Sequence, residues 1–225
     1  MSIHLQREID KLKKNLLSLS ALVEAQVASA VEALQERDLV KARRVLGRDA
    51  EVDQREVEIE EECLKDLALH QPVACDLRFL VSVLKMNKDL ERIGDLAVNI
   101  ARKAITVAGY SDLDIPFDLA GMWEKCHAML RDSIDALVNR DAPLAERICA
   151  RDSEVNRLKH QIRRQGEELL RTQPERVPAW LALLAVARNL ERIADHAVNI
   201  AEDVIYLVEG RIVRHENGQQ TPPRT

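Results

Sequence analysis

The chain has 225 residues with a formal net charge of −5 at pH 7, and 46% of its residues are hydrophobic. Only 3% are aromatic, with 7 glycines and 7 prolines, which argues against β-sandwiches and barrels because these need frequent turns and aromatic or β-branched strands. The acidic balance argues against nucleic-acid binding, which needs a basic face. No apolar run approaches the roughly 20 residues that span a bilayer, and the first residues lack a signal-peptide core, so we expect a cytoplasmic protein.

Hydrophobic periodicity predicts six long helices, arranged as two sets of three. Pro72 is expected in the first turn of the third helix, where its missing amide proton costs no hydrogen bond, and Gly210 is expected to end the last helix. The expected helices are at about 3–36, 39–70, 72–107, 117–139, 142–171 and 174–209. The chain is thereby divided into a first repeat, a linker, a second repeat and a flexible polar tail, over 1–108, 109–118, 119–209 and 210–225.

An internal repeat is the most informative feature of the sequence. Residues 90–101 read LERIGDLAVNIA and residues 190–201 read LERIADHAVNIA, so ten of the twelve positions are identical. The similarity continues upstream, where Gln71-Pro72 recurs as Gln173-Pro174. Helices of about 30 residues that are joined by short turns must lie antiparallel to bury their apolar faces. The sequence therefore predicts an all-α fold of two tandem antiparallel three-helix bundles.

Carboxylates recur at helical spacing in both repeats. Glu91 and Asp95 lie four residues apart on one helix face, opposite its apolar stripe, and Glu191 and Asp195 repeat the pattern. On the middle helix of the first repeat, one face is expected to pack against other helices, and four residues spaced three or four apart along that face are acidic. These are Asp49, Asp53, Glu56 and Glu60. Such a cluster is costly unless a cation joins it, which favours hard divalent or trivalent metal ions, with a network of salt bridges as the alternative.

The second copy of the middle helix departs from this pattern. Asp152 is retained, whereas the next three places of the series hold Asn156, Lys159 and Arg163. A second metal site would therefore be built differently, with ion pairing in place of part of it. His196, which stands where the first copy has a leucine, is a candidate ligand in the second copy alone.

The sequence contains no recognisable catalytic constellation. There is no nucleophile elbow and no glycine-rich loop that would cradle a phosphate. Glu124 and His127 form a single Glu-x-x-His pair, whereas di-iron carboxylate bundles use two such pairs. We therefore expect a protein that is not an enzyme.

The paired LERI…AVNIA motifs and the segment QPVACDLR at 71–78 resemble the PhoU family of phosphate-transport accessory and regulatory proteins. The resemblance extends from about residue 3 to residue 209. It implies a non-enzymatic negative regulator of phosphate uptake and of the phosphate-starvation response. The implied partners are the ATPase subunit of the phosphate ABC transporter, a sensor histidine kinase and a second copy of the chain, with contact to the membrane only through partners.

The same resemblance implies metal bound on Glu/Asp-x-x-x-Asp motifs, as Fe, Zn, Mn or Mg. The implied ligands are Asp49, Asp53, Asp152, Glu91, Asp95, Glu191 and Asp195, although Asn156 breaks the pair at Asp152. Two other functions stay open at this point. One is a related regulator of another transporter or of a persistence pathway, and the other is a metal-dependent enzyme or a metal store.

Overall fold

The fold is described by a computed structural model that covers residues 3–213. No strand occurs in that range, which confirms the predicted all-α class. The predicted tail at 210–225 lies outside the described residues from position 214 onward. The helices are α1 (Ile3–Glu36), α2 (Leu39–Gly47), α3 (Asp49–His70), α4 (Ala74–Ala108), α5 (Leu119–Asn139), α6 (Ala142–Thr172) and α7 (Val177–Glu209), with a short 3₁₀ turn, η1 (Pro174–Arg176), before α7.

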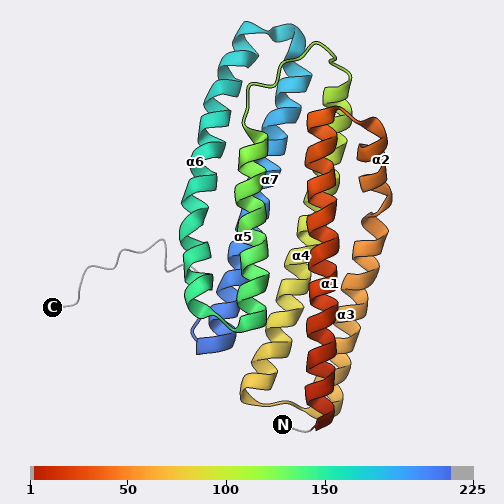
Figure 1. Ribbon diagram of the computed structural model, residues 1–225, viewed down its shortest axis with the longest axis vertical. Coiled ribbons are helices and arrows are strands. Elements are labelled where there is room, and N and C mark those ends of the chain that lie inside the picture. Colours follow the sequence, from red (N-terminus) through yellow and green to blue (C-terminus); the bar gives the residue numbers. More distant parts are fainter. Residues whose placement is uncertain (1–2, 214–225) are drawn as a thin grey trace, which may run out of the picture.

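The two repeats lie side by side with their long helices roughly parallel to one axis (Figure 1). Helices α1–α4 form the first bundle and α5–α7 the second, and α4 packs against α7 between them. Apolar residues of the repeated motif, such as Ile93 on α4 and Ile193 on α7, are fully buried. The buried residues of both bundles form one continuous hydrophobic core. The tandem bundles are thus joined laterally through their last helices.

The middle helix of the first repeat is interrupted, unlike the single helix expected over 39–70. Arg48 has φ −97° and ψ −3°, and its amide donates to the Val45 carbonyl in a tight turn, so α2 ends at Gly47 and α3 begins at Asp49. Glycine lowers helix stability by about 1 kcal/mol relative to alanine. In the second repeat the residue that corresponds to Gly47 is Ala150, and α6 is continuous.

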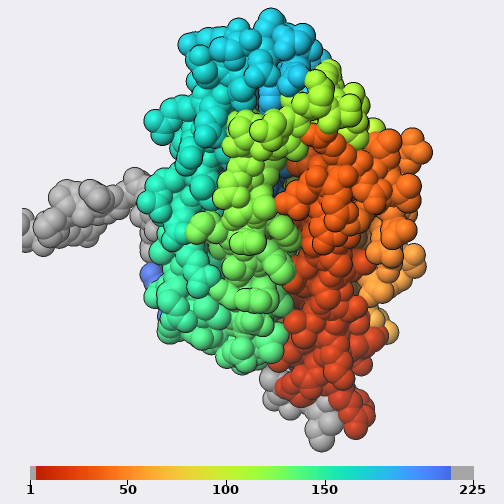
Figure 2. Space-filling model, turned by 45° about the horizontal axis from the view of Figure 1, so that its top comes forward, coloured from red at the N-terminus to blue at the C-terminus, as the bar shows by residue number. Residues whose placement is uncertain are grey.

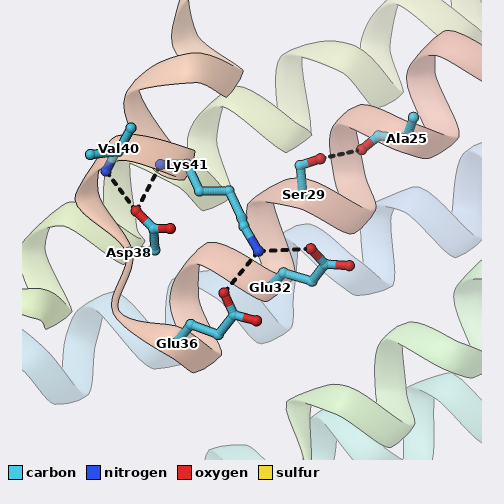
Figure 3. Close-up of polar contacts among 7 residues, drawn as sticks. All are labelled: Ala25, Ser29, Glu32, Glu36, Asp38, Val40 and Lys41. Atoms are coloured by element: carbon cyan, nitrogen blue, oxygen red, sulfur yellow. Dashed lines mark hydrogen bonds and ion pairs between the residues drawn. The ribbon is translucent and has the colours of Figure 1, made fainter.

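Helix α2 begins with a side-chain cap (Figure 3). The Asp38 carboxylate accepts hydrogen bonds from the amides of Val40 and Lys41, at 2.8 and 2.9 Å. The Lys41 ammonium group in turn lies 3.0 Å from Glu32 and 2.8 Å from Glu36, both on α1. A helix of nine residues is unstable in isolation, so α2 depends on the burial of Ala42 and Val45 against the neighbouring helices, to which the cap adds.

The turn before α4 is more extended than expected. Gln71 and Ala74 adopt left-handed backbone conformations, with φ of 42° and 49°, and Val73 between them is extended. Helix α4 therefore begins two residues after Pro72. In the second repeat, Pro174 opens the 3₁₀ turn instead.

Helix α1 is long and apolar enough, over His4–Glu36, to cross a membrane by length and composition alone. Its apolar residues nevertheless face the protein core. Eight of them are at most 1% exposed: Leu12, Leu16, Leu19, Val23, Val27, Ala30, Ala33 and Leu34. On the outer side, α1 lies beside α5 (Figure 2), and His127 Nε2 of α5 is 3.1 Å from Glu24 Oε2 of α1. The helix is thus packed as a core helix of the first bundle.

Gly94 is a sensitive point of this packing, because α4 passes close to α3 there. A Cβ atom on Gly94 would lie 3.1 Å from Val52 Cγ1 and 3.5 Å from Gln26 Oε1. We expect Gly94→Leu to lower the free energy of unfolding by about 1–3 kcal/mol through overpacking. Gly47→Ala is the matched control, since a Cβ atom added there would meet no other atom within 4 Å, and it should be neutral or stabilising by up to about 1 kcal/mol. Urea unfolding measures both, and equal stability of Gly94→Leu and the wild type would contradict the packing argument.

Candidate functional site

The structure brings together the four carboxylates that were predicted as metal ligands in the first repeat. Asp49 and Asp53 on α3 face Glu91 and Asp95 on α4, and we call these four residues the first acidic cluster. Partial burial raises the pKa of Asp49, and the charges of Asp53, Asp95 and Glu91 raise it further. The pKa of Asp95 is raised by burial and then by Glu91. The carboxylates therefore share a region of strongly negative potential.

Two cations of α4 lie within this cluster. Lys88 Nζ is 3.2 Å from Glu91 Oε2 and 3.9 Å from Glu56 Oε1. Arg92 lies 3.7 Å from both Glu91 and Asp95. The salt-bridge network that the sequence left open as the alternative to a metal is therefore formed in part. Lys88 and Arg92 are each about half exposed, so these pairs contribute little to stability.

Glu56 extends the acidic region toward the protein core. It is 9% exposed, and burial raises its pKa, which Lys88 partly offsets. Its backbone carbonyl accepts a hydrogen bond of 2.8 Å from Asn87 Nδ2, which ties α3 to α4 beside the first acidic cluster. Of the four acidic residues that the spacing placed on the packed face of the middle helix, Glu56 is buried and Asp49 is half-buried, whereas Asp53 and Glu60 are exposed, so the prediction of an acidic packed face is only partly correct.

The second repeat gathers a smaller set, Asp152 on α6 with Glu191 and Asp195 on α7, which we call the second acidic cluster. Burial raises the pKa of Asp195 to about 6, and the charges of Glu191 and Asp152 add to the shift. Asn156 Nδ2 donates to Asp152 Oδ2 at 2.6 Å, and Lys159 forms an ion pair with Glu191. Of the residues that differ from the first repeat, Lys159 therefore offsets part of the negative charge of this cluster, and Asn156 satisfies one oxygen of Asp152.

The donor atoms of both clusters suit a hard metal ion, since all are carboxylate oxygens. Asp152 Oδ1 is buried and accepts no hydrogen bond from the described residues, so it has a lone pair available for a cation, whereas Glu91 Oε2 already lies 3.2 Å from Lys88 Nζ. Among those residues, however, no three Asp, Glu, His or Cys side chains are already arranged to hold a metal ion. Binding would require the carboxylates to turn away from Lys88 and Lys159 toward a shared point.

Two histidines that attracted attention in the sequence have other contacts. His196 Nδ1 lies 2.7 Å from Asp89 Oδ1, which also accepts a hydrogen bond from Asn199, so His196 joins α7 to α4. His127 contacts Glu24 rather than its own helix neighbour Glu124. Sequence reasoning missed Asp89 and Glu24 because these contacts depend on how the two repeats pack, and no local motif marks them.

A second polar contact between the repeats involves a buried acid. Asp203 on α7 is 1% exposed, and Lys85 Nζ on α4 lies 3.2 Å from its Oδ1. The same ammonium group lies 5.1 Å from the centre of the Tyr206 ring. Helices α4 and α7 run antiparallel. Asp89 of α4 contacts His196 of α7, and Lys85, which comes earlier in α4, contacts Asp203, which comes later in α7.

Comparison with known proteins agrees with the repeat and with the fold. The PhoU domain model matches residues 16–104 and again 119–204. A phosphate-specific transport system accessory protein PhoU homolog of Pseudomonas putida is 38% identical over 209 residues, which cover 92% of this chain and 82% of that protein. The PhoU protein of Escherichia coli K12 is 32% identical over 213 residues, covering 95% and 88%. The crystal structure of PhoU from Pseudomonas aeruginosa superposes with a TM-score of 0.87 at 36% identity, over 92% of this chain and 99% of that one.

The raised pKa of Asp195 has a consequence for stability. The folded chain disfavours the ionised carboxylate, so its destabilising effect is fully present above about pH 6 and is relieved as the pH falls from about 6 toward the usual value of 3.8. Asp195→Asn should therefore raise the melting temperature most at pH 7.5, and less at pH 5. Calorimetry in the presence of EDTA measures the difference, and a gain that grows toward pH 5 would contradict the assignment.

Proposed function

The chain belongs to the PhoU family, and we propose that it serves as an accessory protein of a phosphate-specific transport system, as the names of its relatives say of them. The observation that carries the proposal is the doubled domain, matched in both repeats, in a chain that covers 82% and 88% of two of its relatives. A protein of this kind acts through contacts with other proteins. Its long outer helices supply the surface for such contacts, and its relatives are named as accessory proteins rather than enzymes.

The proposed role is negative regulation. The protein would restrain phosphate uptake and hold the phosphate-starvation response off when phosphate is plentiful. It would do so by contacting both the ATPase subunit of a phosphate ABC transporter and a sensor histidine kinase, in the cytoplasm and without catalysis. The acidic clusters support such contacts, because charged surfaces steer and select partners that carry the opposite charge.

Metal binding at the acidic clusters is part of the proposal. Asp49, Asp53, Glu91 and Asp95 would hold Fe, Zn, Mn or Mg in the first repeat. Bound there, the ion would add its positive charge to that of Lys88 and Arg92. The raised pKa values of Asp49 and Asp95, which reflect burial and the neighbouring carboxylates, support this assignment. Because it would bind carboxylates of both helices, such an ion would hold α3 against α4.

The regulatory role is tested in the native cell. Deleting the gene should raise phosphate uptake and switch on phosphate-starvation genes at high phosphate, because the restraint on the transporter and the kinase is lost. Labelled-phosphate uptake and a transcriptional reporter measure the two effects. The wild-type gene should restore both. Unchanged uptake and unchanged transcription at both high and low phosphate would rule out the regulatory role.

The metal site is tested by elemental analysis of untagged protein. Wild type should retain metal after gentle purification, whereas a variant with Asp49→Asn, Asp53→Asn, Glu91→Gln and Asp95→Asn should lose the metal of the first repeat. The matched variant Asp152→Asn, Glu191→Gln, Asp195→Asn reports the second repeat. Full metal content in the first variant, or none in the wild type, would show that the first acidic cluster is not a metal site.

A further inference from the structure

The groove between the middle and last helices carries opposite charge in the two repeats. In the second repeat, a pocket of about 580 Å³ opens between α6 and α7, and we call it the second groove. Four basic and two acidic side chains line it, giving a formal charge of +2. They are Lys159, Arg163, Arg188, Arg192, Glu191 and Asp195. The corresponding positions of the first repeat, Glu56, Glu60, Lys88, Arg92, Glu91 and Asp95, have a formal charge of −2.

Among the described residues, two of the basic side chains in the second groove have no acidic partner. Lys159 is paired with Glu191, and Arg163 is paired with Glu167 at 2.9 Å. Arg188 and Arg192, by contrast, form no ion pair with any described residue, although both line the pocket. Their counterparts in the first repeat are both engaged by carboxylates. The positive charge of the second groove is therefore available to a ligand.

The floor of the second groove is apolar. It is made by Ile162 of α6 and by Leu184 and Ala187 of α7. Leu184 lies directly against the backbone of α6, because a Cβ atom on Gly166 would come within 2.5 Å of Leu184 Cδ2. In the first repeat the place of Gly166 is taken by Cys63, which is completely buried. The missing side chain thus leaves room for a hydrophobic floor beneath the cationic rim.

We propose that the second groove binds a small organic anion whose phosphoryl or carboxylate groups are held by Arg188 and Arg192 and whose apolar part rests on Ile162, Leu184 and Ala187. Guanidinium groups bind both kinds of oxyanion through paired, charge-assisted hydrogen bonds. The pocket volume lies in the range of small-molecule sites, and an apolar floor with a few polar groups is their usual composition. The site goes beyond the regulatory role and does not depend on it.

Binding is tested by calorimetric titration on the full chain, stripped of metal and dialysed free of chelator, with ATP, phthalate, inorganic phosphate and a glutamate-rich peptide as probes. ATP and phthalate, which both carry an aromatic ring, distinguish phosphoryl from carboxylate recognition. Inorganic phosphate lacks the apolar part, so it should bind at least about tenfold more weakly than the preferred probe. The double variant Arg188→Ala with Arg192→Ala should bind the preferred probe at least about tenfold more weakly than the wild type does, since charge-assisted hydrogen bonds are lost. The matched control, Lys88→Ala with Arg92→Ala, should bind as the wild type does.

A second variant uses the difference between the repeats. Lys159→Glu with Arg163→Glu installs the first-repeat residues, and it should abolish binding while circular dichroism shows an intact helical fold. No binding of ATP or phthalate at millimolar concentration, or equal loss in both arginine and control variants, would overturn the proposal. Binding of the glutamate-rich peptide alone would overturn it in favour of a protein partner. None of these results changes the phenotype expected on gene deletion, so the two proposals fail separately.

Discussion

The packing of α4 against α7 is the contact on which the rest of the structure depends. Both helices carry the repeated motif, and its apolar positions are buried on both sides of the contact. Burial of apolar area at this scale is the main favourable term in folding, so the repeats are held as one body rather than as two independent bundles. The same two helices also carry Glu91, Asp95, Glu191 and Asp195. Packing of α3 against α4 and of α6 against α7 then completes the two acidic clusters.

The contact between the repeats is not symmetric in its polar side chains. His196 of the second repeat pairs with Asp89 of the first. The residue equivalent to His196 in the first repeat is Leu96, and the residue equivalent to Asp89 in the second is Asn189. These two residues cannot form an ion pair. Lys85 likewise reaches Asp203 from one repeat only. The two repeats therefore share the apolar residues of this contact, whereas each polar pair is formed in only one of the two equivalent places. The second groove is the same kind of divergence at the surface, where Lys159 stands in place of Glu56.

Much of the candidate site could be predicted from the sequence, because residues four apart on a helix share a face. This placed Asp49 with Asp53, Glu91 with Asp95 and Glu191 with Asp195. The structure shows that the first two pairs meet across α3 and α4, and that Asp152, also a predicted ligand, lies near the third pair. What spacing could not supply was the neutralising partners. Lys88 and Lys159 were visible in the sequence, but their contacts with Glu91 and Glu191 depend on side-chain conformation and helix packing.

The sequence by itself determined the helical class, the duplication and the family, because apolar periodicity and motif identity are properties of the order of residues. It did not reveal the break at Arg48, where the preceding glycine, a single weak helix former, decides between one helix and two. Only the tertiary structure decided that the bundles lie side by side, that His196 contacts Asp89, and that Gly166 leaves room for Leu184 beneath Arg188. These features join residues far apart in the chain, and their free energy depends on distances that no local pattern encodes.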